Sequence, residues 1–193
     1  MVKEPIPGRV KTRLGRDLGM VQAAHWFRKQ ALDTILRLED PRWDLVLAVS
    51  PDRAGMTSRF WPAHLERLPQ GRGDLGARMG RLLRASPSTK TCIIGADIPN
   101  IRPQHIASAF VALGSHRGVI GPSDDGGYWL IGMRHGRYAP ATLFKGVRWS
   151  TSCARKDTQN SAKGLNWAEI NTLSDVDTLE DLTRLNAQAR SAL

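Results

Sequence analysis

Hydrophobic residues recur at helical spacing in four parts of the chain. The clearest pattern covers residues 18–38, where apolar positions return every three or four residues until Asp40 and Pro41 interrupt them. Similar patterns predict helices over residues 75–83, 103–113 and 174–189. The last of these begins with Ser174 and carries acidic residues in its first turns, which is typical of a helix N-terminus.

Short continuous apolar runs separate these helices. They predict strands buried on both faces over residues 45–49, 91–95, 118–121 and 128–133. Strands that alternate with helices indicate an α/β fold with a layered, largely parallel sheet. Ligands of such folds bind outside the carboxyl ends of the strands, so Asp97 and the loop 123–127 are candidate site residues.

The length of 193 residues fits one domain, which we place at residues 1–193. A content of 41% apolar and 24% charged residues is ordinary for a globular protein and argues against disorder. No run approaches about 18 apolar residues, and the first residues lack the apolar core of a signal peptide. Cys92 and Cys153 have no further pair to form a zinc site or a disulfide framework. We therefore expect a cytoplasmic protein with no membrane partner.

The net charge of +10, from 28 Lys and Arg against 18 Asp and Glu, favours anionic partners. Residues 1–16 carry five cations and one acid, which makes this segment the candidate for binding anions. Nucleic acid would suit such a charge, but the chain has no long Lys/Arg run and no basic segment interleaved with aromatic residues. We therefore disfavour nucleic acid as a partner, and a solvated basic surface accounts for most of the other arginines.

Two glycine-containing segments carry candidate nucleotide-binding chemistry. Residues 8–12 lack the earlier glycine of a Walker motif, yet Lys3, Lys11 and Arg13 make a compact cationic loop that suits phosphates. An exposed basic terminus is the alternative for that loop. Residues 71–76 spell G-x-G-x-x-G, but a charged segment with a proline precedes them instead of a buried strand, which argues against a dinucleotide site.

Carboxylates mark the expected binding edge of the sheet. Asp97 follows a predicted strand, where an aspartate either caps a turn or binds a hard cation such as Mg²⁺ together with substrate phosphates. Asp124 and Asp125 precede Gly126 and Gly127, a setting for a tight turn, a metal ligand or a catalytic base. The residues alone leave these alternatives open.

Five blocks of the sequence together resemble the DUF2064 family of proposed glycosyltransferases. The blocks are residues 3–14 (KEPIPGRVKTRL), residues 70–79 from Gln70 to Met79, residues 95–99 (GADIP), residues 121–132 (GPSDDGGYWLIG) and residues 149–151 (WST). The family belongs to the nucleotide-diphospho-sugar transferase superfamily, which has the GT-A fold and includes nucleotidyltransferases such as phospholactate guanylyltransferase. The resemblance implies a Rossmann-like three-layer sandwich with a mostly parallel central sheet.

The resemblance also implies roles for individual residues. Six would bind the nucleotide, four at its phosphates and two at its base: Lys3, Gly8, Lys11 and Arg13, then Gln70 and Gly76. Asp97 would bind Mg²⁺ or Mn²⁺, although Pro99 replaces a second aspartate of the superfamily pattern. The loop with Asp124 and Asp125 would lie over the transferred group or the acceptor. Trp149 and Ser150 would come from a later loop on the acceptor side.

These roles predict metal-assisted transfer of a sugar from a nucleotide-diphosphate donor to a small-molecule acceptor. Lys11 and Arg13 would stabilise charge on the leaving diphosphate, and Asp125 would be the base for the acceptor hydroxyl, with Asp124 as the alternative. Nucleotidyl transfer from a nucleoside triphosphate to a phosphorylated small molecule needs the same loop and metal. It stays open, as does a non-catalytic nucleotide-binding role. The sequence does not determine the donor, the acceptor or the oligomeric state.

The family carries a buried strand before the first block, whereas Met1 and Val2 are all that precede Lys3 here. We therefore expect the first strand to be truncated and the natural product to begin upstream with an apolar run. The physical reason is that a central parallel strand supplies hydrogen bonds on two sides and buried side chains on two faces. A chain that starts at Met1 is expected to leave a gap or an exposed sheet edge beside Val2 and Lys3.

Overall fold

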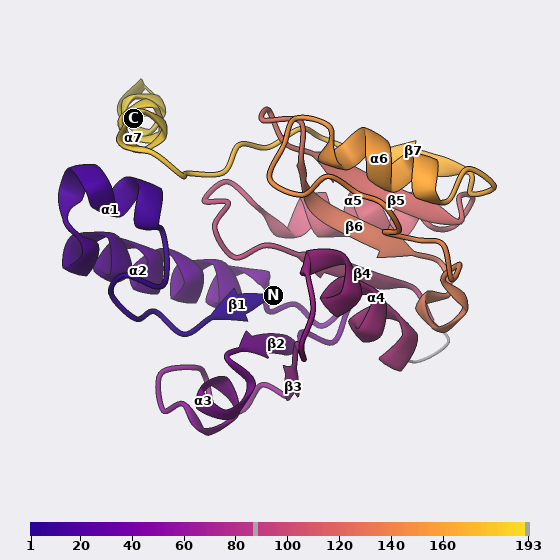
Figure 1. Cartoon of the computed structure of the whole chain (residues 1–193), viewed down its shortest axis with the longest axis horizontal. Coiled ribbons are helices and arrows are strands. Elements are labelled where there is room, and N and C mark those ends of the chain that lie inside the picture. The colour runs from indigo at the N-terminus through magenta and orange to yellow at the C-terminus, as the bar shows by residue number, and fades with distance from the viewer. Residues whose placement is uncertain (87–88, 192–193) are drawn as a thin grey trace.

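The computed structural model describes residues 1–86 and 89–191, in which strands and helices alternate (Figure 1). The strands are β1 (Val2–Lys3), β2 (Leu47–Ser50), β3 (Arg67–Pro69), β4 (Thr91–Ile94), β5 (Gly118–Pro122), β6 (Tyr128–Met133) and β7 (Trp167–Glu169). The helices are α1 (Thr12–Leu18), α2 (Met20–Leu38), α3 (Asp52–Thr57), α4 (Leu75–Ala85), α5 (Pro103–Ala112), the short 3-10 helix η1 (Gly136–Tyr138), α6 (Ala154–Ser161) and α7 (Leu179–Ser191). Within these residues, no helix is long and apolar enough to cross a membrane.

The strands form two sheets. In the first sheet, β1, β2 and β3 lie parallel in that order. In the second sheet the order is β4-β6-β5-β7, with β6 antiparallel to both of its neighbours and β7 parallel to β5. The main-chain nitrogen of Met1, the residue before β1, donates to the main-chain oxygen of Ile94 at the end of β4 at 2.6 Å. The α/β fold is confirmed, with one parallel and one mixed sheet.

The mixed character of the second sheet comes from a short loop. Residues 123–127 are all that separate β5 from β6, whereas a crossover between parallel strands needs about a dozen residues or more. The two strands therefore run antiparallel, with Gly118 opposite Met133. Gly126 allows the turn because its φ is +84°, a left-handed conformation that glycine adopts without a steric cost.

The two faces of the second sheet belong to different hydrophobic cores. Leu130 packs with Ile106 of α5, and the next residue, Ile131, packs with Leu83 of α4 on the opposite face. The sheet thus lies between layers of helices, as the three-layer prediction requires (Figure 1). A third core joins the buried face of α2, including Phe27 and Ile35, to the first sheet.

The helix predicted over residues 174–189 is wrong at its start. Helix α7 begins at Leu179, because Thr178 and Asp181 form the cap. The Asp181 carboxylate accepts hydrogen bonds from the main-chain nitrogens of Asp177 and Thr178, at 3.1 and 2.9 Å. Residues 174–177, before this cap, have no regular secondary structure, and the Val176 main-chain nitrogen donates to the Asp97 main-chain oxygen just beyond β4.

Candidate active site

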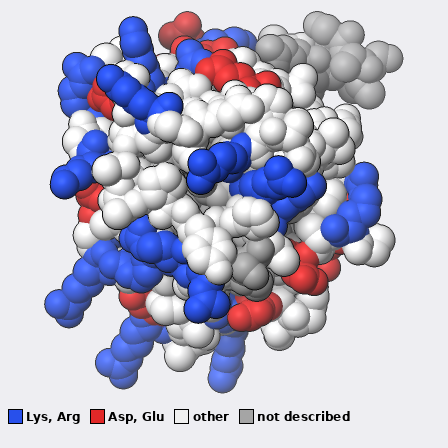
Figure 2. Space-filling model, turned by 90° about the vertical axis from the view of Figure 1, so that its right-hand side faces the viewer, with Lys and Arg blue, Asp and Glu red and all other residues white. Residues whose placement is uncertain are grey.

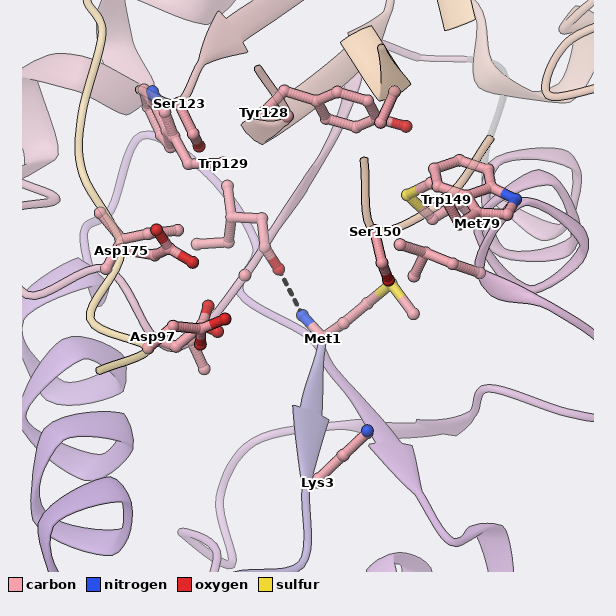
Figure 3. A pocket seen from close by; sticks show the side chains of 18 of the residues that line it. Met1, Lys3, Met79, Asp97, Ser123, Tyr128, Trp129, Trp149, Ser150 and Asp175 are labelled. Atoms are coloured by element: carbon pink, nitrogen blue, oxygen red, sulfur yellow. Dashed lines mark hydrogen bonds between the residues drawn. The ribbon is translucent and has the colours of Figure 1, made fainter. Parts of the chain in front are cut away.

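A pocket of about 740 Å³ opens where the two sheets meet. Its lining comes from the N-terminal loop, the start of α4, the end of β4, the β5–β6 loop, residues 149–154 and the segment before α7. Asp97 and Asp175 lie on one side of this space, with Met79, Trp149 and Ser150 across from them (Figure 3). The predicted location at strand carboxyl ends therefore coincides with a real cavity.

Three carboxylates gather at one side of this pocket. Asp97, Asp175 and Asp177 each place an oxygen within 4.8 Å of the others, although the first lies far from the other two in sequence. The main-chain nitrogen of Val176 donates a hydrogen bond to the main-chain oxygen of Asp97 at 3.4 Å, and the Val176 side chain is buried. Val176 thus anchors this segment in the interior, while the aspartates on either side of it, Asp175 and Asp177, both line the pocket.

Lys11 reaches into this carboxylate cluster. Its Nζ lies 2.8 Å from Asp97 Oδ2 and 2.5 Å from Asp177 Oδ1, and only 5% of its side chain is exposed. Burial by itself would lower the pKa of Lys11, but attraction to Asp97 and Asp177 outweighs burial and raises it. Burial likewise opposes ionisation of Asp97, and Lys11 outweighs it, so the pKa of Asp97 is lowered. Both groups are therefore charged at neutral pH.

Lys11 also has an unusual main-chain conformation. Its φ of 45° and ψ of 46° are left-handed, a region that non-glycine residues seldom enter. Strain of this kind is found most often at ligand and catalytic sites, where surrounding contacts hold it. Here the two ion pairs to Asp97 and Asp177 and the following helix α1 hold the residue in place.

Asp175 differs from its two neighbours in the cluster. Within the part of the chain that the structure describes, its carboxylate makes no hydrogen bond or ion pair, and it is half-buried. Burial, followed by repulsion from Asp177 and Asp97, raises the pKa of Asp175 to about 6. A carboxylate of this kind can accept a proton or a cation near neutral pH.

The two aspartates of the β5–β6 loop have different surroundings. Asp125 lines the pocket, and its Oδ1 accepts a hydrogen bond from the Gly127 nitrogen at 2.8 Å, while Oδ2 has no partner among the residues that the structure describes. Asp124 is not among the pocket residues, and its Oδ2 accepts a hydrogen bond from the Ser174 hydroxyl. Of the two proposed bases, Asp125 thus faces the cavity while Asp124 ties its loop to the segment before α7.

The six predicted nucleotide-binding residues fall into two groups. Lys3, Lys11, Arg13 and Gln70 line the pocket, whereas Gly8 and Gly76 do not. Gly8 is exposed with a φ of +75°. Gly76 lies buried in α4, where a Cβ would come within 2.7 Å of both Phe144 and Trp149, so its place in the structure is one of close packing.

Gln70 has a structural task that the sequence does not reveal. Its side chain is 3% exposed, and Nε2 donates to the main-chain oxygens of Val2 at 3.0 Å and Ala48 at 2.9 Å. Both amide hydrogens are used in these bonds. Oε1 is therefore the atom that Gln70 can offer to a ligand in the pocket.

The residues predicted for the acceptor side lie together at the pocket wall. Trp149 and Ser150 both line the cavity, and the Trp149 ring packs against Phe144 at 6.1 Å between centroids. Among the described residues, the buried Nε1 of Trp149 has no hydrogen-bond partner. Ser150 has a φ of 59°, which turns the chain sharply at the cavity.

Basic side chains surround the carboxylate cluster. Lys3, Arg9, Arg13 and Arg78 line the same pocket, and Arg78 is oriented by a hydrogen bond from Nε to the Gly73 oxygen at 2.9 Å. On the molecular face in Figure 2, Lys and Arg side chains project from several separate places with acidic side chains between them. At the pocket, in contrast, cations from three segments converge on one cavity, an arrangement that suits a phosphorylated ligand.

Sequence reasoning found Asp97 but missed Asp175 and Asp177 as members of the same cluster. Both were interpreted as part of a helix start, because acidic residues are common there. The available signal was the alternation of Asp175, Val176 and Asp177, which is typical of an extended segment with one buried face.

Residues 34–151 match the protein family described as "Uncharacterized protein conserved in bacteria (DUF2064)". The crystal structure of a "putative nucleotide-diphospho-sugar transferase" from Desulfovibrio desulfuricans G20 has a TM-score of 0.85 and 30% sequence identity, over 95% of this chain and 83% of that one. A homologue of Mycobacterium tuberculosis Rv0371c from Mycobacterium sp. strain JC1 has a TM-score of 0.51 and 15% identity, over 85% of this chain and 83% of its own. The second likeness concerns the fold alone. No curated protein sequence matches the chain.

Proposed function

The chain belongs to the DUF2064 family, and we propose that it transfers a sugar from a nucleotide-diphosphate donor to a small-molecule acceptor with the help of Mg²⁺ or Mn²⁺. The observation that carries the proposal is one cavity in which basic side chains face three clustered carboxylates. The likeness to the Desulfovibrio protein supports a transferase that uses a nucleotide sugar.

The clustered carboxylate oxygens fit a hard divalent cation. Mg²⁺ and Mn²⁺ prefer carboxylate oxygens, and Asp97, Asp175 and Asp177 present such oxygens close together while Asp175 lacks another partner in the described chain. When bound, the ion supplies charge neutralisation for the leaving diphosphate. These three residues would hold it.

The other pocket residues then have distinct tasks. Lys11 and Arg13 bind the donor phosphates, with Lys3 at the same wall, and stabilise the negative charge that builds on the leaving group. The walls formed by Trp149 and Tyr128 exclude water and orient the sugar and the acceptor.

A base is needed to accept the proton of the attacking hydroxyl. Asp125 is our candidate, because it lines the cavity and, within the described part of the chain, only its Oδ1 has a partner, the Gly127 nitrogen. Asp124 is the weaker choice because it bonds Ser174 outside the pocket. The Asp125 oxygen would take the hydroxyl proton as the acceptor oxygen forms its bond to the sugar.

The decisive experiment separates sugar transfer from nucleotidyl transfer. The protein with Mn²⁺ is incubated with a panel of nucleotide-diphosphate sugars and, separately, with nucleoside triphosphates, and released nucleoside diphosphate and pyrophosphate are quantified. We expect nucleoside diphosphate from one donor. Release of pyrophosphate instead would assign the pocket to nucleotidyl transfer.

A binding measurement tests donor recognition without a known acceptor. A true donor at a hundred times its Kd stabilises the protein by about 2.7 kcal/mol, which raises the melting temperature by several degrees. Asp97→Asn should abolish the Mn²⁺-dependent part of this rise, since the amide loses the charge that the ion needs. The matched control is Asp17→Asn, at an exposed position of α1 outside the pocket. A melting temperature that no donor changes in the unaltered protein would contradict the proposal.

A further inference from the structure

Lys11 holds the same oxygens that a divalent ion would need. Its Nζ lies between Asp97 Oδ2 at 2.8 Å and Asp177 Oδ1 at 2.5 Å. Mg²⁺ binds carboxylate oxygens at about 2.1 Å, so it would have to enter the same space. An ammonium group and a divalent ion repel each other strongly at such separations. The two cations therefore exclude each other from the position between Asp97 and Asp177.

With the Lys11 ammonium bound, the carboxylate cluster keeps an excess of negative charge. Lys11 makes short ion pairs with two of the three carboxylates, and Asp175 has no hydrogen bond or ion pair in the described chain. Arg13 contributes an exposed, longer contact, 3.5 Å from Asp177 Oδ2. The cluster thus keeps a residual attraction for a cation of higher charge than Lys11 supplies.

A displaced Lys11 side chain has a second place to go. Lys11 lines the pocket together with Arg9 and Arg13, so its ammonium can turn from the carboxylates into the cavity. The flexible four-carbon stem permits this movement without a change in the main chain. In the cavity the ammonium would meet the phosphates of the donor beside Arg13.

Building on the proposed function, we propose that Lys11 is a resident cation of the carboxylate cluster that a divalent ion displaces, and that donor binding favours the displaced state. Metal entry releases the ammonium from Asp97 and Asp177, and the donor diphosphate gives it a new partner. Metal and donor therefore bind with positive coupling, which acts in both directions by thermodynamic linkage. In the free protein, Lys11 keeps the half-buried carboxylates of Asp97 and Asp177 charged and in place.

Chemical labelling of the unaltered protein tests the exchange directly. An amine-acylating reagent modifies accessible lysines, and mass spectrometry follows Lys11 against Lys29, an exposed residue of α2 outside the pocket, as internal control. Because the Lys11 side chain is 5% exposed, its labelling should be slow without metal and should rise about tenfold at saturating Mn²⁺, as the free form becomes dominant. Labelling of Lys29 should not change. A Lys11 rate that Mn²⁺ leaves unchanged overturns the proposal.

Calorimetry with Mn²⁺ alone provides the second readout. Lys11→Met removes the competing ammonium and should tighten Mn²⁺ binding by about tenfold, equivalent to about 1.4 kcal/mol. Lys29→Met, at an exposed position of α2 outside the pocket, is the matched control and should leave the Kd unchanged. Equal Kd values for Lys11→Met and the unaltered protein, or no Mn²⁺ binding by either, overturn the exchange. Donor turnover in the unaltered protein with unchanged Lys11 labelling would refute the exchange alone and leave the proposed function standing.

Discussion

Replacing Gln70 with methionine should destabilise the protein through the contact between β1 and β2. The Gln70 amide donates to the Val2 oxygen at 3.0 Å and to the Ala48 oxygen at 2.9 Å, and the side chain is 3% exposed. Each lost bond leaves a carbonyl without this partner at a cost of about 1–2 kcal/mol. Methionine has a similar volume, so the cavity contribution is small. The expected loss of unfolding free energy is about 2–4 kcal/mol.

Urea denaturation and thermal melting measure this loss. For a chain of this length, about 1 kcal/mol shifts the melting temperature by about 2–4 °C, so a fall of roughly 5–15 °C is expected. Gln104→Met at an exposed position of α5 is the matched control and should change stability by less than about 0.5 kcal/mol. If the Gln70 and Gln104 variants were equally stable, the amide would not hold β1 to β2, and a purely ligand-binding role would be favoured.

Three further predictions concern the loop, the core and the carboxylate cluster. Gly126→Ala should cost about 2–3 kcal/mol in urea denaturation, because φ is +84° and a Cβ would collide with the Ser152 main chain; an unchanged midpoint would contradict this. Trp61→Phe should cost about 2–3 kcal/mol, since the buried Nε1 donates to the Glu4 carboxylate, and a loss below about 0.5 kcal/mol would show that the bond is not stabilising. In metal-free buffer, Asp175→Asn should raise the melting temperature above about pH 6 and have no effect below about pH 4. The pKa of Asp175 is raised from 3.8 to about 6 in the folded protein, so the unaltered protein loses stability as pH rises through that interval. A melting difference independent of pH would refute this assignment.

The sequence by itself determined the elements whose signal is local. The repeating apolar positions of residues 18–38 correspond to helix α2, and the apolar run at residues 91–95 contains strand β4. These patterns are reliable because each reflects one element burying one face or both faces. Asp97 could be placed at the binding edge because it comes just after the predicted apolar strand that contains β4. Shorter elements such as α3, with six residues, carry too few positions for a period to emerge.

Only the tertiary structure decided which distant residues meet in the pocket. Lys11 and Asp97 are 86 positions apart, and Lys11 and Asp177 are 166 apart, so no local pattern records their ion pairs. The same holds for Asp175, which local chemistry assigned to a helix start. Its position in the cluster depends on the Thr178–Asp181 cap, which starts α7 late, and on Val176, which packs its side chain in the core beside Asp97. Such contacts form only after the strands and helices have packed, because burial of Val176 and mutual attraction of opposite charges act across the assembled fold.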